Sequence, residues 1–179
     1  MSVDLRAPIR RRSYEGIAKR IFDLLIAAPV SLLLAPIALL IGIAVRVEDS
    51  GPAIFHQHRV GVGGRLFILR KFRTMPAGTP DIPSGEAQSL RVTRVGRFLR
   101  RTSLDEIPQL LSILKGDMSV VGPRPAIPQQ QGLIELRAQN GSLRVKPGLT
   151  GLAQVNSYDG MPESEKARWD GEYAKQVSL

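Results

Sequence analysis

Residues 24–45 read LLIAAPVSLLLAPIALLIGIAV, a run of 22 residues without a charge. As a helix this run is about 33 Å long, which is enough to cross the hydrocarbon core of a bilayer. It is too long for the core of a signal peptide, and no convincing cleavage site follows it. Lys19 and Arg20 precede it and Arg46 follows it, so cations that can reach lipid headgroups flank both ends. The run predicts a helix in contact with membrane lipid.

Positive charge and two prolines bear on how this helix lies in a membrane. Of the 25 Lys and Arg residues, six fall in residues 1–20 and the other nineteen in residues 46–179, so both flanks look cytoplasmic. Pro29 and Pro36 each remove an amide donor and favour a bend. A helix broken near Ala35-Pro36 can enter one leaflet and return to the same face. A kinked ordinary span fits the residues equally well, because large domains translocate largely regardless of charge.

Composition narrows the partners of the chain. The 179 residues allow one domain plus an accessory segment, and a net charge of +9 points to a polyanion such as nucleic acid, anionic lipid or a phosphorylated substrate. Aromatic residues make up only 5%, which leaves few stacking platforms for single-stranded nucleic acid. The absence of cysteine excludes disulfides and thiolate metal sites. His56 and His58 alternate on a predicted strand without further His or Cys ligands, which favours a structural role.

Residues 91–125 contain most of the candidate catalytic and phosphate-binding residues. Arginines recur at three- and four-residue spacing from Arg91 to Arg101, and the pair Asp105-Glu106 follows closely. Adjacent carboxylates beside fixed cations suit a site that handles phosphate and a divalent metal. Spacing alone favours a plainer reading, in which Ser103-x-x-Glu106 is a capping box that opens a helix and Lys115-Gly116 ends it. The two readings are compatible, because a capped helix N-terminus also binds anions.

The remaining patterns predict a small mixed fold. Lys71 and Arg73 share one face of a predicted strand, and Trp169 and Tyr173 lie one helical turn apart, which suits either the core or a membrane interface. Residues 76–89, rich in proline and glycine, predict a mobile loop. The expected elements are strands at 53–59, 66–74 and 152–155 and helices at 89–101, 127–138 and 163–175, with a turn at 61–64 between the first two strands.

Four strings of sequence together resemble one family. They are KRIFD at 19–23, KFRTM at 71–75, VGRFLRRTSLDEIPQLLSILKGDMSVVGPRP at 95–125 and PGLTGLAQVN at 147–156. In this order they are similar to the bacterial sugar transferases, the monotopic polyprenol-phosphate phosphoglycosyl transferases, in their small form that consists of the catalytic domain only. The likeness extends from Lys19 to about Tyr173.

This resemblance implies a fold and a location. The fold is α/β, more precisely α+β and mostly helical: a monotopic membrane protein on the cytoplasmic face of a bacterial inner membrane. Residues 1–49 form a basic segment and a re-entrant membrane helix at about 20–46, kinked at Pro36. Residues 50–179 form a small cytoplasmic catalytic domain with interfacial amphipathic helices. Two positions depart from the family pattern: Ala35 stands where Ser precedes the proline, and Leu152 stands where Trp is usual.

The resemblance also implies an activity, namely transfer of a sugar-1-phosphate from a UDP-sugar to polyprenyl (undecaprenyl) phosphate with release of UMP. Asp105 is then the nucleophile that forms a phosphosugar–enzyme intermediate and a contact of Mg²⁺, and Glu106 is its acid/base or metal partner. Membrane lipid and other enzymes of glycan assembly are expected partners, and nucleic acid is not. The residues assigned to substrate binding are Lys71, Arg73, Arg100, Arg124 and Pro125.

A different class of function explains part of the same sequence. A membrane-anchored basic module that binds anionic lipid or nucleic acid without catalysis accounts for the charge and the apolar run. It does not explain the Asp105-Glu106 pair. Salt-dependent, sequence-independent binding without UMP release would favour this alternative.

Overall fold

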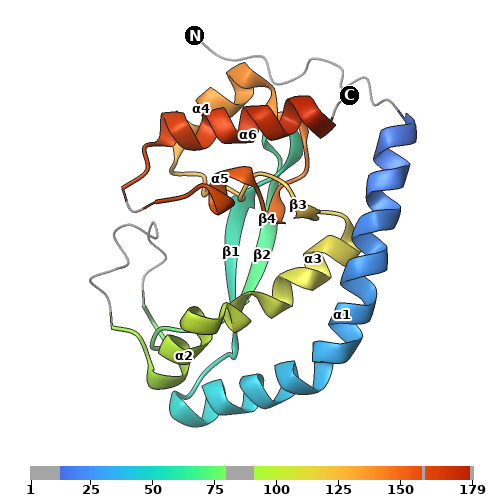
Figure 1. The fold of residues 1–179 in the computed structure, drawn as a ribbon. Helices are drawn as coiled ribbons and strands as arrows, with labels where there is room; N and C mark the ends of the chain where they lie inside the picture. Colours follow the sequence, from blue (N-terminus) through green and yellow to red (C-terminus); the bar gives the residue numbers. More distant parts are fainter. Residues whose placement is uncertain (1–12, 80–90, 159, 178–179) are drawn as a thin grey trace.

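The structure is a computed structural model that describes residues 13–79, 91–158 and 160–177. One long helix runs along the side of a mixed body in which a two-stranded hairpin occupies the middle (Figure 1). The predicted mixed, mostly helical fold is confirmed. The elements, with η for 3-10 helices, are α1 (Ser13–Glu48), β1 (Ile54–Val60), η1 (Val62–Gly64), β2 (Leu66–Phe72), α2 (Arg94–Thr102), η3 (Leu104–Gln109), α3 (Leu110–Lys115), β3 (Ser119–Val121), α4 (Gln131–Asn140), η4 (Ser142–Arg144), β4 (Gly148–Thr150), α5 (Leu152–Val155) and α6 (Glu163–Val177).

Helix α1 contains the apolar run and both of its prolines. It stays helical over 36 residues and changes direction along its length instead of breaking (Figure 1). The part Gly16–Glu48 is long and apolar enough to cross a membrane, by length and composition. The predicted apolar helix is therefore present and longer than expected at both ends.

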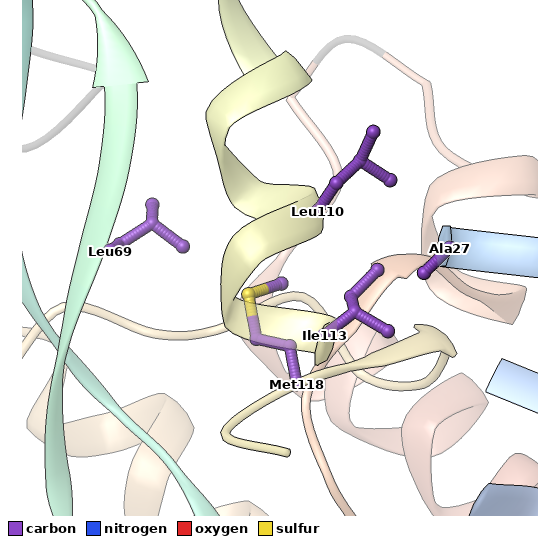
Figure 2. Packing of buried hydrophobic residues seen from close by; sticks show 5 residues of the cluster. All are labelled: Ala27, Leu69, Leu110, Ile113 and Met118. Carbon is purple, nitrogen blue, oxygen red and sulfur yellow. The ribbon is translucent and has the colours of Figure 1, made fainter. Parts of the chain in front are cut away.

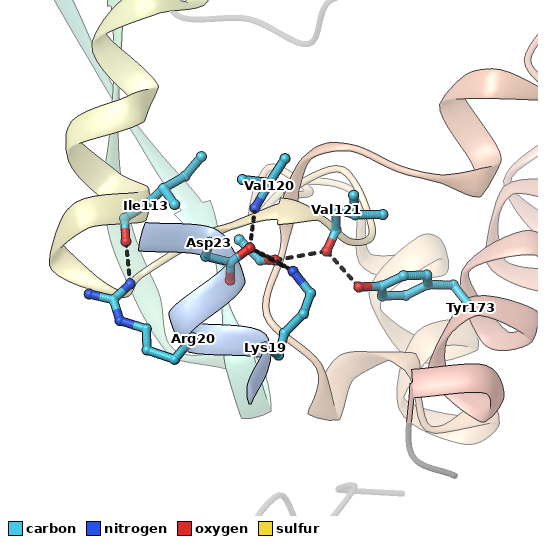
Figure 3. Close-up of polar contacts among 8 residues, drawn as sticks. Lys19, Arg20, Asp23, Ile113, Val120, Val121 and Tyr173 are labelled. Carbon is cyan, nitrogen blue, oxygen red and sulfur yellow. Dashed lines mark hydrogen bonds and ion pairs between the residues drawn. The ribbon is translucent and has the colours of Figure 1, made fainter. Parts of the chain in front are cut away.

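The N-terminal half of α1 is tied to the body by polar contacts (Figure 3). The Asp23 carboxylate, 1% exposed, accepts hydrogen bonds from the Ser119 hydroxyl and the Val120 amide, each at 3.0 Å. Lys19 forms an ion pair with Asp23 at 2.6 Å and also donates to the Ser119 hydroxyl. Arg20 donates to the carbonyls of Ile113 and Leu114 at the end of α3. A buried carboxylate with this many donors fixes the helix against β3.

Apolar contacts continue the attachment toward the other end of α1. Ala27 is part of a buried cluster with Leu69, Leu110, Ile113 and Met118, drawn from α1, β2, α3 and the segment before β3 (Figure 2). A second cluster joins two residues of α1 to β2 and α2: Ile41, Val45, Phe72 and Leu99. The opposite side of α1 stays uncovered, with Leu25, Leu32, Leu33, Leu39 and Leu40 all at least 66% exposed.

The strands form two separate sheets. β1 and β2 pair antiparallel from Ile54↔Phe72 to Val60↔Leu66, and Gly63 and Gly64 in the connecting η1 have positive φ, as the predicted glycine turn requires. β3 pairs parallel with β4, with Ser119 opposite Gly148 and Val121 opposite Thr150.

The strand predicted at 152–155 was wrong, because these residues form α5. The neighbouring residues 148–150 form the strand β4 instead and pair with β3. A Cβ on Gly148 would lie 2.1 Å from the Gly122 nitrogen, so only glycine lets the two backbones meet there.

The other predicted helices are confirmed with shifted bounds. α2 begins at Arg94, where the Thr93 hydroxyl caps it by accepting from the Gly96 amide at 2.9 Å. Residues 80–90 lie outside the described part, so the mobile loop predicted at 76–89 remains a prediction. Tyr173 on α6 is buried and donates to the Val121 carbonyl at 2.6 Å, so it belongs to the core and not to a membrane interface.

Replacing Asp23 with Ala should lower the free energy of unfolding by about 3 kcal/mol, because Lys19, Ser119 and the Val120 amide lose their shared acceptor. Fluorescence of the single tryptophan during denaturant unfolding in detergent measures the change. Glu172→Ala, which breaks an exposed pair with Lys175, is the control and should cost less than about 0.5 kcal/mol. Equal effects of the two substitutions would contradict the assignment.

Candidate active site

One cavity of about 640 Å³ brings the predicted site residues together. Its walls come from the β1–β2 hairpin, the segment 73–79, the junction of α2 and η3, and the loop after β3. Pro125 and Pro36 are not among the residues that line it. The predicted residues that do are Lys71, Arg73, Arg100, Asp105, Glu106 and Arg124.

The backbone between α2 and η3 turns sharply at Ser103. Ser103 has φ 55, the only positive φ at a non-glycine residue in the described part of the chain, and its side chain caps no helix. The predicted capping box was therefore wrong: Ser103 ends α2, and Glu106 points elsewhere. Pro108 gives a physical reason, since it has no amide and disfavours the α conformation at Ile107, and residues 104–109 form a 3-10 helix. The turn directs Asp105 and Glu106 toward the cavity.

Glu106 holds two cations with one oxygen. Its Oε1 accepts from Lys71 Nζ at 2.6 Å and from Arg124 Nη2 at 2.8 Å. Burial alone would raise the pKa of Glu106, but the charges and hydrogen bonds of Arg124 and Lys71 lower it to about 2. Glu106 is therefore ionised at neutral pH, which suits a charge partner or metal ligand better than a proton donor.

Asp105 lies beside this pair in a different electrostatic setting. It is only 9% exposed. Burial raises its pKa and the Glu106 carboxylate adds to the increase, while Lys71 and Arg100 oppose it. The charged form of Asp105 is thus poorly solvated, and a poorly solvated carboxylate oxygen facing a cationic cavity is suited to attack an electrophile.

Arg100 and Arg73 occupy other parts of the wall. Arg100 Nε donates to the Thr74 hydroxyl at 2.9 Å, and the residue is otherwise exposed. Arg73 donates to the Asp49 carbonyl and pairs with the Asp49 carboxylate at 3.4 Å, which joins the end of α1 to β2. Its buried Nη1 has no hydrogen-bond partner among the described residues. Substrate contact by Arg73 remains a prediction.

The loop that carries Arg124 is held through its carbonyls. Arg137 Nη1 donates to the Arg124 carbonyl, Arg59 Nη1 to the Pro125 carbonyl and the Val60 amide to the Ala126 carbonyl, each at 2.9 Å. Arg137 is itself 5% exposed and paired with the buried Asp170 at 2.7 Å.

Sequence reasoning assigned no role to Arg59, Arg137 or Asp170. The available signal was a lone arginine on the apolar side of a predicted helix, close to Leu133. For Pro125, the structure shows a hydrogen-bonded carbonyl behind Arg124 instead of a cavity surface.

Comparison with known proteins bears on what this cavity does. The model of the family described as "Bacterial sugar transferase" matches residues 14–179 of the chain. The chain belongs to the bacterial sugar transferase family.

Curated relatives of this chain carry related names. It is 45% identical over 150 residues to the UDP-glucose:undecaprenyl-phosphate glucose-1-phosphate transferase of Caulobacter vibrioides, covering 82% of this chain and 56% of the relative. The protein of the same name from Escherichia coli K12 is 38% identical, with 90% of this chain and 37% of the relative covered. The exopolysaccharide production protein ExoY of Rhizobium meliloti is 37% identical, with 94% and 81% covered. The chain thus spans little more than half of the first relative and less of the E. coli protein.

The two carboxylates at the first cavity could hold a magnesium ion. Among the described residues no three His, Cys, Asp or Glu side chains gather as a metal cluster. Magnesium does not need one, because it keeps several waters and binds through one or two carboxylates plus substrate phosphates. Asp105 lines the cavity, and both cation contacts of Glu106 fall on Oε1. These two side chains are the donors that would hold the ion.

Removing the charge of Asp105 and removing the charge of Glu106 should change the free energy of unfolding in opposite directions. At pH 7, Asp105→Asn should raise the free energy of unfolding, because the amide avoids the burial penalty that raises the pKa of Asp105. Glu106→Gln should lower it by about 1–3 kcal/mol, because Lys71 and Arg124 lose their charged partner. Denaturant unfolding measures both, and Asp117→Asn at an exposed position is the control.

The pH dependence follows from the signs of the two shifts. The stabilisation from Glu106 is complete above its ordinary pKa of 4.5 and is lost as the pH falls toward 2. The advantage of Asp105→Asn is present at neutral pH and vanishes below the ordinary Asp value of 3.8. Destabilisation by both variants at pH 7 would mean that Asp105 is a structural carboxylate.

Proposed function

We propose that this chain transfers a sugar-1-phosphate from a UDP-sugar to polyprenyl phosphate, in bacteria undecaprenyl phosphate, with release of UMP, and thereby starts the assembly of a glycan at the membrane. One observation carries the proposal: a desolvated Asp105 faces a cavity whose wall also holds Lys71, Arg100 and Arg124. The names of the relatives, which include a glucose-1-phosphate transferase acting between UDP-glucose and undecaprenyl phosphate, support it.

In the first step, an oxygen of Asp105 attacks the β-phosphorus of the UDP-sugar. A phosphorus–oxygen bond to Asp105 forms, and the bond from the β-phosphorus to the bridging oxygen breaks, so that UMP leaves with the electron pair. Arg100 and Arg124 neutralise charge on the phosphates, and Lys71 supports them from the strand. Phosphoryl transfer depends mainly on positioning and charge neutralisation. The fixed cations in the wall of the cavity provide both.

In the second step, a phosphate oxygen of the polyprenyl phosphate attacks the same phosphorus. The bond to Asp105 breaks, the carboxylate is released, and the product is a polyprenyl diphosphate sugar. Mg²⁺ held by Asp105 and Glu106 would supply additional neutralisation of phosphate charge. In the ligand-free chain Glu106 keeps Lys71 and Arg124 close to each other, ready for a phosphate.

The non-catalytic alternative, a membrane-attached basic module for anionic lipid or nucleic acid, has less support. Its basic surface is present in α2, where Arg94, Arg97 and Arg101 are exposed together with Phe98. These residues suit a helix that lies at the headgroup level. However, this alternative does not explain why the buried Asp105 carboxylate lies beside the Glu106 carboxylate, which pairs with two cations.

The membrane arrangement that we propose is monotopic, with α1 re-entrant and both of its ends on the cytoplasmic face of the inner membrane. Near its start α1 is fixed by Asp23 to β3, and at its end Glu48 accepts from the amides of Arg94 and Val95 at the start of α2. Both ends are thus attached to one body. This arrangement is difficult to combine with a straight span, which separates the two ends by the thickness of the bilayer.

Incubation with a UDP-sugar and Mg²⁺, without polyprenyl phosphate, tests the chemistry. The wild type should release about one UMP per enzyme as a burst, and mass spectrometry should find a sugar-phosphate adduct on the peptide with Asp105. Asp105→Asn should abolish both, whereas the exposed Asp117→Asn should retain both. Full turnover by folded Asp105→Asn would refute the covalent mechanism. A screen over several UDP-sugars with the acceptor present identifies the donor, and salt-dependent binding without UMP release under every condition would favour the basic module.

Single cysteines test the topology, since the chain has none of its own. Cysteines placed at Ser2 and at Ser178 should both be protected from an impermeant thiol reagent in intact cells and should both react after lysis. Pro36→Ala restores a helix donor and should increase the fraction of molecules in which one terminus is labelled. Labelling of only one of the two sites in the otherwise unchanged chain would show an ordinary span.

A further inference from the structure

Two acidic residues at the end of α1, Glu48 and Asp49, hold segments that build the first cavity. Neither is among the residues that line the cavity, yet each bonds to a segment that does. This end of α1 lies beside the start of α2 (Figure 1). The outer side of the same helix end is apolar and uncovered, with Leu40 67% and Val47 80% exposed. Contacts to the cavity wall and an exposed apolar surface thus occupy the last turns of one helix.

Glu48 holds the start of α2. Its two carboxylate oxygens accept from the amides of Arg94 and Val95 at 2.5 and 2.8 Å. A helix leaves its first amides without partners of its own, and a negative charge at this end also favours the helix dipole. The helix is nine residues long and carries Arg100 in its last turn, where Arg100 lines the cavity. Glu48 therefore helps to fix the helix that presents Arg100.

Asp49 holds the segment 73–79 that follows β2. Its Oδ2 accepts from the Ala77 amide at 2.7 Å and pairs with Arg73 at 3.4 Å, and its carbonyl accepts a further hydrogen bond from the Arg73 guanidinium. Every residue from 73 to 79 lines the first cavity. None of them is among the residues that line a second, mostly aliphatic cavity of about 510 Å³. Asp49 thus supports a wall that belongs to the first cavity.

The two supported segments meet at Thr74. The Thr74 hydroxyl accepts from Arg100 Nε at 2.9 Å, and the Thr74 carbonyl accepts from the Thr93 amide at 3.1 Å. A Cβ on Gly96 would lie 2.1 Å from the same carbonyl oxygen, so α2 lies directly against the segment. The Arg100 guanidinium is therefore oriented from both sides, by α2 and by Thr74. Recognition of phosphate by a guanidinium depends on this orientation.

We infer that Glu48 and Asp49 are positioning residues for the nucleotide sugar, Glu48 acting through Arg100 and Asp49 through the segment 73–79. The inference rests on the proposed function and adds that the donor side of the site is built on the end of α1. Affinity for the nucleotide sugar then depends on two carboxylates that do not touch it.

The donor half-reaction tests Asp49 in the full chain in detergent. The rate of the UMP burst is measured against the concentration of UDP-glucose, the donor named for two of the relatives, with Mg²⁺ and without polyprenyl phosphate. If the wild type prefers another UDP-sugar, that donor takes its place. Asp49→Ala should raise the half-saturating concentration about tenfold, because the wall segment shifts, while the burst stays near one UMP per enzyme.

Two further variants separate positioning from folding. Asp49→Asn keeps an oxygen for the Ala77 amide and loses only the charge that faces Arg73, so its increase should be smaller than that of Asp49→Ala. A variant that only unfolds lowers the size of the burst and leaves the half-saturating concentration of the remaining enzyme unchanged. Glu172→Gln, in an exposed pair with Lys175 on α6, is the control and should leave both quantities unchanged.

A double-mutant cycle tests whether Glu48 acts through Arg100. Glu48→Ala alone should raise the half-saturating donor concentration about threefold, and in an Arg100→Ala background it should add nothing, since the residue that carries the effect is gone. Equal increases in both backgrounds would overturn the role assigned to Glu48. An unchanged half-saturating concentration in both Asp49→Ala and Asp49→Asn would overturn the role assigned to Asp49.

Failure of this inference differs from failure of the proposed function. Absence of UMP release from the wild type with every UDP-sugar refutes the proposed function. A normal wild-type burst, combined with wild-type donor dependence in the Glu48 and Asp49 variants, refutes only the positioning roles.

Discussion

The rest of the site depends on the Glu106 carboxylate, which joins three distant segments through one oxygen. Lys71 lies 35 residues before it on β2, and Arg124 lies 18 residues after it in the loop behind β3. The two cations keep Glu106 ionised, and the ionised Glu106 keeps them from repelling each other. A phosphate group that entered the cavity would compete with Glu106 for the same cations. The ligand-free arrangement is thus already shaped for an anion, and Glu106 takes the place of one.

The scaffold around this carboxylate serves mainly to fix backbone positions. Arg137 and Arg59 use buried guanidinium groups to hold the carbonyls of Arg124 and Pro125. Close backbone contact at Gly122 and Gly148 brings β4 against the start of the same loop. As a result the backbone of Arg124 has little room to move, while its side chain, paired with Glu106, is 45% exposed toward the cavity. A guanidinium fork needs this, since bidentate recognition of phosphate depends on orientation.

Much of the fold could be predicted from the sequence, and the failures have identifiable causes. The apolar run, the glycine turn and the C-terminal helix have strong local signals, and the structure contains all three. The capping box failed because Pro108 and the left-handed Ser103 impose a 3-10 turn, an effect that the S-x-x-E spacing does not reveal. The strand at 152–155 failed because pairing with β3 depends on glycine contacts between distant segments.

The candidate site shows the same contrast between features with a local sequence signal and features that depend on contacts between distant segments. The resemblance supplied the six residues that gather at the first cavity, whereas the two cation contacts on one oxygen of Glu106 required coordinates. The buried Arg137–Asp170 pair has no local sequence signature, because its partners lie on two helices that meet only in the folded chain. The residues that line the cavity were therefore easier to predict than the residues that hold them in place.

The attachment of Asp23 has a consequence for how the protein is made. The donor Ser119 is synthesised 96 residues after Asp23, so when the carboxylate leaves the ribosome only Lys19 is available to pair with it. Final seating of the helix must then wait until β3 has been translated. Docking of α1 against the rest of the body is therefore a late step in the synthesis of the chain.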